Sequence, residues 1–127
     1  MLQKLLVIDD DQTVITFVHA RLEAHGYRVI VALNGEEGLQ QAKETKPDLI
    51  ILDVQMPSMD GYTFVQEIKK SDDLRDTPII ILTAKDKLED LFKAEGIKDY
   101  LVKPVDIKIL LDKIQSRIGP TKKQSKK

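Results

Sequence analysis

The feature that most constrains this chain is a regular alternation of short apolar runs with longer segments of helical periodicity. Residues 5–8, 49–52 and 79–82 are continuous apolar runs, as is typical of strands that are buried on both faces. Residues 12–25 instead carry apolar side chains at helical spacing. Repeated strand-then-helix units predict a parallel sheet with helices on both of its faces.

Cap and turn residues set the expected bounds of these elements. Gly26, Pro47 and Gly96 stand where helices should end, and Asn34 and Asp106 stand where helix N-caps are expected. The expected strands are residues 5–8, 27–32, 49–52, 78–82 and 99–102. The expected helices are residues 12–25, 35–46, 62–70, 86–95 and 107–118. This series predicts an α/β fold with a five-stranded, doubly wound parallel sheet.

Length and composition exclude several classes of protein. A chain of 127 residues suits one domain. The sequence has no cysteine, which excludes disulfides and thiolate metal sites. No apolar run approaches the roughly 18 residues that a membrane span needs, and the first residues lack the apolar core of a signal peptide. We therefore expect a soluble, cytoplasmic protein without a membrane span.

The formal charge of −1 is unevenly distributed along the chain. Residues 119–127 are rich in lysine and contain no apolar side chain, so we expect a disordered Lys-rich tail that follows a domain of residues 1–118. Residues 1–118 consequently carry a net negative charge, which disfavours binding to the phosphates of nucleic acid. We expect no direct DNA binding.

Polar side chains stand directly after four of the expected strands. Asp9 and Asp10 follow the first strand, Asp53 the third, Thr83 the fourth and Lys103 the fifth. Ligands of open parallel sheets bind beyond the carboxyl ends of the strands. These five residues are therefore the candidate site.

The chemistry of these side chains suits phosphoryl transfer. Two carboxylates about 4 Å apart repel each other by roughly 4 kcal/mol at an effective dielectric constant near 20, so the cluster should recruit a cation. Carboxylate oxygens with room for water suit Mg²⁺. A carboxylate, a metal, a lysine and a hydroxyl are the groups needed to place a phosphoryl group on an aspartate.

Four motifs in this order resemble the receiver domain of bacterial two-component response regulators, of the single-domain, chemotaxis-regulator-like kind. They are residues 7–11 (Val-Ile-Asp-Asp-Asp), 53–61 (Asp-Val-Gln-Met-Pro-Ser-Met-Asp-Gly), 83–84 (Thr-Ala) and 99–104 (Asp-Tyr-Leu-Val-Lys-Pro). The resemblance covers residues from about 4 to 118. It implies a (βα)5 fold with the flavodoxin-like strand order 2-1-3-4-5.

The resemblance also implies a role for each site residue. Asp53 would be the phosphoacceptor, with Lys103 and Thr83 contacting the phosphoryl group. The bond between Lys103 and Pro104 would be cis. The implied Mg²⁺ ligands are Asp10, Asp53 and the backbone carbonyl of Gln55, with Asp9 acting mostly through water.

The same resemblance implies the partners and the output. A histidine kinase or phosphotransfer protein would donate the phosphoryl group, and the chain would be a signalling phosphoacceptor rather than an enzyme with a separate substrate. Thr83 and Tyr100 would form the switch, and the fourth helix, fifth strand and fifth helix would bind a downstream protein. The interval from Thr83 to Lys103 is shorter than is usual in the family, so we expect a shortened or displaced fourth helix.

Other interpretations of the same residues remain open at this point. Asp9 and Asp11 also fit the nucleophile motif of haloacid-dehalogenase-type phosphatases, although that reading leaves Asp53 unexplained. A receiver-like binding module that is never phosphorylated is a further alternative. Asp11 stands where the first helix begins, which favours an N-cap over a metal ligand. Without the resemblance, Tyr100 would be interpreted as a core aromatic residue.

Overall fold

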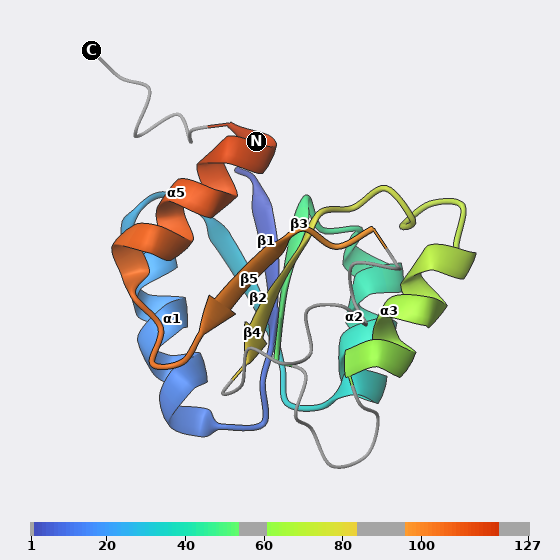
Figure 1. Cartoon of the computed structure of the whole chain (residues 1–127), viewed down its shortest axis with the longest axis horizontal. Helices are drawn as coiled ribbons and strands as arrows, with labels where there is room; N and C mark the ends of the chain where they lie inside the picture. The colour runs from blue at the N-terminus through green and yellow to red at the C-terminus, as the bar shows by residue number, and fades with distance from the viewer. Residues whose placement is uncertain (1, 54–60, 84–95, 120–127) are drawn as a thin grey trace.

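A computed structural model describes residues 2–53, 61–83 and 96–119 of the chain. Strands and helices alternate along these residues (Figure 1). The strands are β1 (Lys4–Ile8), β2 (Arg28–Ala32), β3 (Leu49–Asp53), β4 (Ile79–Thr83) and β5 (Asp99–Val102). The helices are α1 (Gln12–Ala24), α2 (Gly35–Thr45), α3 (Gly61–Lys70) and α5 (Ile107–Ile118).

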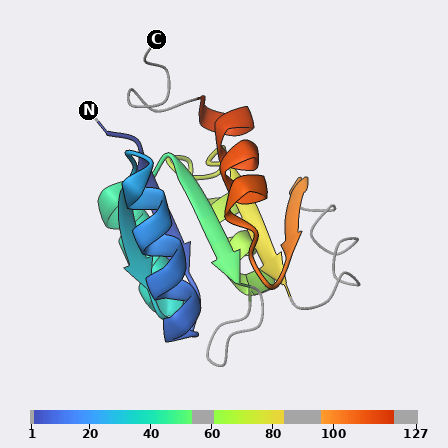
Figure 2. The same cartoon turned by 90° about the vertical axis from the view of Figure 1, so that its left-hand side faces the viewer.

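The strands form one parallel sheet in the order β2-β1-β3-β4-β5. Helices α1 and α5 cover one face of this sheet, and α2 and α3 cover the other (Figures 1 and 2). Alternate residues of β1 divide between the two layers, because successive side chains of a strand point to opposite faces. Leu5 and Val7 belong to the core on the α1 side, whereas Leu6 and Ile8 belong to the core on the α2 side.

The predicted fold class and strand order are confirmed. Every described strand and helix lies within two residues of its predicted bounds. The predicted helix over residues 86–95 and residues 120–127 of the predicted tail lie outside the described residues. In the parts of the chain that the structure describes, no helix has the length and apolar character that crossing a membrane requires.

Local capping explains why the helices begin where they do. The side chains of Asp11, Asn34 and Asp106 accept hydrogen bonds from backbone N–H groups in the first turns of α1, α2 and α5. These bonds satisfy donors that have no partner within a helix. After α1, Gly26 adopts a φ of 97°, a conformation that glycine adopts without steric cost. The four residues were all identified as helix boundaries from the sequence.

A close approach of α2 to the sheet fixes the end of β1. A Cβ atom on Gly38 would lie 2.5 Å from Ile8 Cδ1, a distance that no side chain can tolerate without displacing its neighbour. Ile8 is the last residue of β1 and precedes Asp9 directly. The packing of α2 therefore holds the strand end from which the acidic residues project.

Candidate functional site

The register of the sheet brings the four polar strand ends to one edge. Ile8 pairs with Leu52. The residues that follow them along the chain, Asp9 and Asp53, therefore lie side by side. On the other side of β3, Asp53 pairs with Leu82, the residue before Thr83. Lys103 follows the last residue of β5, and its backbone N–H donates to the Thr83 carbonyl (2.8 Å). The strand ends thus meet as the sequence predicts.

Three carboxylates gather at this edge. Asp9, Asp10 and Asp53 each offer an oxygen atom within 4.8 Å of the others. Asp9 and Asp53 are buried, with 0% and 2% of their surface exposed, whereas Asp10 is exposed. Buried carboxylates at this separation repel each other strongly unless a cation lies between them. The cluster therefore favours cation binding from the side on which Asp10 meets solvent.

Lys103 supplies part of that positive charge. Its Nζ lies 2.9 Å from Asp9 Oδ2 and 3.5 Å from Asp53 Oδ2. Burial lowers the pKa of Lys103, but its close contacts with the carboxylates of Asp9 and Asp53, and the attraction of their charges, outweigh this effect and leave the pKa raised. The ammonium is therefore charged at neutral pH. The peptide bond between Lys103 and Pro104 is cis.

Asp9 is held at both of its carboxylate oxygens. The Asp11 N–H donates to Asp9 Oδ1 (2.9 Å). Asp9 Oδ2 has only the ion pair with Lys103, because no donor among the described residues is aligned to form a hydrogen bond with it. A buried oxygen of this kind has unused capacity as an acceptor.

The carboxylate of Asp11 has a structural role. It accepts hydrogen bonds from the N–H groups of Thr13 (2.9 Å) and Val14 (3.4 Å) and so caps α1. The N-cap interpretation is confirmed, and the capping carboxylate lies outside the three-carboxylate cluster. The bond from Asp11 N–H to Asp9 was not anticipated in the sequence analysis. The sequence pattern that could have predicted it is an aspartate in a turn, which tends to accept a hydrogen bond from the backbone N–H two residues later.

The remaining predicted site residues lie around this cluster or outside the described chain. Thr83 is buried at the end of β4, with 2% of its surface exposed. Tyr100 is half-buried on β5, and its hydroxyl donates to the Ile97 carbonyl (2.9 Å), toward the amino-terminal end of the strand. Gln55, whose carbonyl is a predicted ligand, lies outside the described residues.

These residues fit a divalent cation. Oxygen atoms from three carboxylates lie together, one of them the buried Asp9 Oδ2 without an aligned donor. An all-oxygen site with one solvent-facing carboxylate suits Mg²⁺, which keeps several of its water molecules when it binds. Lys103 already balances part of the negative charge of the three carboxylates.

Comparisons with known proteins agree with this arrangement. The family model of the response regulator receiver domain matches residues 5–115. Protein PilH of Pseudomonas aeruginosa is 36% identical over 115 residues, which are 89% of this chain and 95% of PilH. Several other relatives are transcriptional regulators, and this chain spans about half of their length.

Solved structures show the same fold. The chemotaxis protein CheY4 of Vibrio cholerae has a TM-score of 0.87 and 34% identity, over 92% of this chain and 99% of CheY4. The receiver domain of the sensor histidine kinase PA1611 from Pseudomonas aeruginosa has a TM-score of 0.85 and 31% identity, over 94% of this chain and 99% of that one. The latter structure has a magnesium ion coordinated in its active-site cleft.

Proposed function

Because this chain belongs to the response regulator receiver domain family, we propose that it is a signalling module that accepts a phosphoryl group on Asp53. Receiver domains are phosphorylatable signalling modules rather than enzymes that turn over a separate substrate. The donor is a phosphohistidine on a histidine kinase or a phosphotransfer protein. The observation that carries this proposal is the cluster of Asp9, Asp10 and Asp53, with Lys103 between two of its buried carboxylates.

Mg²⁺ is the cofactor of the proposed reaction. Asp10, Asp53 and the Gln55 carbonyl hold the ion directly, and Asp9 contacts it mostly through water. The magnesium ion in the cleft of the PA1611 receiver domain supports this assignment. When bound, the ion offsets negative charge on the phosphoryl oxygens.

The transfer is a displacement at phosphorus. An oxygen lone pair of Asp53 forms the new O–P bond while the P–N bond of the phosphohistidine breaks, and the electron pair of that bond returns to the imidazole ring. Lys103 then exchanges its contact with Asp53 for one with the phosphoryl group. The Thr83 hydroxyl donates to another phosphoryl oxygen. Both contacts stabilise charge where it develops during the transfer.

The signal leaves the site through Thr83 and Tyr100. Movement of Thr83 toward the phosphoryl group opens space beside β5, and the Tyr100 ring turns into that space. This is a shift between two states, and it occurs because the phosphoryl group binds one state better than the other. A downstream protein then binds β5 and α5 together with the predicted fourth helix, whose residues 86–95 lie outside the described chain. Residues 1–118 are the receiver domain in this proposal, followed by a Lys-rich tail.

Mass spectrometry after incubation with acetyl phosphate and Mg²⁺ tests the phosphoacceptor. We expect one added phosphoryl group on the wild-type chain and none on Asp53→Asn. Asp112→Asn is a matched control, because it removes an exposed carboxylate of α5 that lies far along the chain from the cluster. Equal labelling of Asp53→Asn and wild type would refute the assignment, and no labelling of either would favour a binding module that is not phosphorylated.

A further inference from the structure

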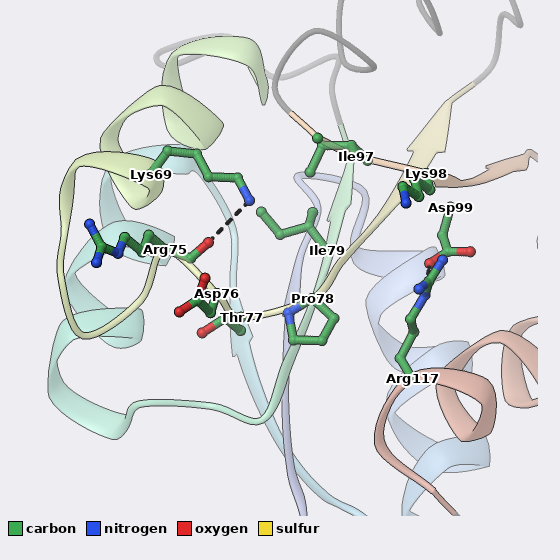
Figure 3. A pocket seen from close by; sticks show the side chains of 11 residues that line it. Lys69, Arg75, Asp76, Thr77, Pro78, Ile79, Ile97, Lys98, Asp99 and Arg117 are labelled. Carbon is green, nitrogen blue, oxygen red and sulfur yellow. Dashed lines mark hydrogen bonds and ion pairs between the residues drawn. The ribbon is translucent and has the colours of Figure 1, made fainter.

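A cavity of about 390 Å³ lies at the end of the sheet opposite to the carboxylate cluster. Its walls are the end of α3, residues 75–79, residues 96–99 and Arg117 near the end of α5 (Figure 3). These segments include the starts of β4 and β5, whereas the carboxylates lie at the carboxyl ends of β1 and β3. Its volume is within the range of small-molecule sites. The cavity is therefore separate from the proposed phosphorylation site.

The floor and the rim of the cavity differ in chemistry. Pro78, which is half-buried, provides most of the apolar surface, because only 4% of Ile79 and 3% of Ile97 is exposed. Four cationic side chains line the cavity, together with the carboxylates of Asp76 and Asp99: Lys69, Arg75, Lys98 and Arg117. In Figure 3, Lys69 reaches from α3 toward Ile79 and the carbonyl of Arg75.

The rim has more hydrogen-bond donors than acceptors. Lys69 Nζ uses one donor on the Arg75 carbonyl (3.1 Å), and an ammonium has three. Lys98 makes no ion pair with any residue in the described ranges. Arg117 uses Nε on Asp99 Oδ2 (2.5 Å), and a guanidinium has four further N–H donors. Asp99 is paired with Arg117, whereas Asp76 lines the cavity without an ion pair to any described residue. The unused donors of the lysines and of Arg117 still outnumber these two carboxylates and suit a ligand with anionic oxygens.

One wall of the cavity is also the segment that holds Tyr100. The Ile97 carbonyl accepts the hydrogen bond from the Tyr100 hydroxyl, and the side chain of Ile97 lines the cavity. Asp99, the residue before Tyr100, is paired with Arg117 on the same side of the cavity, across from Lys69 (Figure 3). A ligand that contacts both Lys69 and the segment of residues 97–99 would therefore favour the arrangement in which Tyr100 stays bonded to Ile97.

We propose that this cavity is an effector site for a small organic anion with an apolar body, and that its occupation favours the Tyr100 conformation seen here. The anionic oxygens bind Lys69, Lys98 and the free donors of Arg117, and the apolar body covers Pro78 and Ile79. Coupling between two sites is reciprocal, so the Tyr100 hydrogen bond must in turn affect ligand affinity. The consequence for signalling rests on the proposed role of Tyr100, whereas binding to the cavity does not.

Titration of the isotopically labelled chain with benzoate, followed by NMR, tests the site without Mg²⁺ or a phosphodonor. We expect saturable shifts at the amides of residues 96–99. The double variant Lys69→Gln/Lys98→Gln should bind benzoate about tenfold more weakly, the effect of two partly exposed charge contacts. The matched double variant Lys43→Gln/Lys108→Gln removes the same charge from exposed lysines outside the cavity and should bind like wild type. Benzamide, the uncharged analogue, should not saturate the site.

Tyr100→Phe tests the link to β5. Loss of the hydroxyl removes the bond to Ile97 and should weaken benzoate binding about threefold, the size of a partly exposed hydrogen bond. Unchanged affinity in this variant would overturn the coupling. Absence of saturation, equal binding of benzamide, or equal binding by the two double variants would overturn the site. None of these results depends on Asp53, so failure of the phosphoacceptor proposal is detected separately by mass spectrometry.

Discussion

The two ends of the sheet hold charge in opposite ways. At the carboxyl end, two of the three clustered carboxylates are buried, and one lysine lies between them. At the amino end, Asp99 is paired with Arg117, and the cavity is lined by four cationic side chains against the two carboxylates of Asp76 and Asp99. The first end is short of positive charge and the second is short of negative charge. The same fold thus has one site whose charges favour a cation and one site whose charges favour an anion.

Burial decides how much each charged group contributes to stability. Removing one partner of a buried ion pair leaves an uncompensated charge and costs several kcal/mol, whereas an exposed pair contributes about 0–1 kcal/mol. The Lys103 side chain is 22% exposed and the Asp9 side chain 0%, against 39% for Arg117 and 13% for Asp99. We therefore expect substitutions at the carboxyl end to have the larger effects.

The largest effect is expected for Lys103→Met. Without the ammonium, Asp9 and Asp53 face each other uncompensated, so the free energy of unfolding should fall by about 2 kcal/mol. Added Mg²⁺ should restore much of this loss, because a cation that binds only the folded state stabilises it. Urea unfolding with and without Mg²⁺ measures both quantities. Lys108→Met, on the exposed side of α5, is the control and should stay within about 0.5 kcal/mol of wild type.

The opposite sign is expected for Asp10→Asn. This change removes one of three mutually repelling carboxylates, so stability without Mg²⁺ should rise by about 1 kcal/mol. The same variant should lose the stabilisation by Mg²⁺ and the Mg²⁺-dependent labelling of Asp53. Thermal unfolding at several Mg²⁺ concentrations tests this combination. A variant that is more stable yet still gains stability from Mg²⁺ as wild type does would show that Asp10 is not a ligand.

The comparison of the two ends also explains what could be predicted from the sequence. Strands, caps and fold class depend on local patterns such as the apolar run of β3 and the N-cap at Asn34, so they were predicted within two residues. Asp9, Asp53 and Lys103 were identified because each lies at the carboxyl end of a strand of a parallel sheet, where register alone brings strand ends together.

Other features depend on side-chain direction and on the path of loops. The sequence did not indicate that Lys103 Nζ lies nearer to Asp9 than to Asp53. Nor did it indicate the cavity, which forms only because residues 75–79 and 96–99 border a common space. The sequence also did not indicate the hydrogen bond from the Tyr100 hydroxyl to the Ile97 carbonyl, because this bond depends on the rotamer of the tyrosine ring. The amino end was therefore missed because its residues share no strand-end pattern.

The smallest expected effect is on the free energy of unfolding at alkaline pH. Its pH dependence distinguishes the charged groups of the two ends. Attraction to its carboxylates raises the pKa of Lys103 above its ordinary value of 10.5. Burial likewise raises the pKa of Tyr27 above 10.0. As pH rises, the unfolded chain releases these protons first, so stability is complete below about pH 10 and declines above it. Lys103→Met should reduce this decline, and Tyr27→Phe should remove the tyrosine part.

For the Arg117–Asp99 pair at the amino end, the same measurement should show no change of slope. The hydrogen bond to Asp99 raises the pKa of Arg117 above its ordinary value, so the guanidinium stays charged in both the folded and the unfolded chain throughout the range of about pH 9–11. Arg117→Gln should therefore lower stability by about 0.5 kcal/mol at every pH in this range and leave the slope unaltered. Urea unfolding at several pH values measures the slope. Suppose that Lys103→Met kept the wild-type dependence of unfolding free energy on pH while Arg117→Gln changed it. The conclusion that Lys103 interacts more strongly with its carboxylates than Arg117 does with Asp99 would then be wrong.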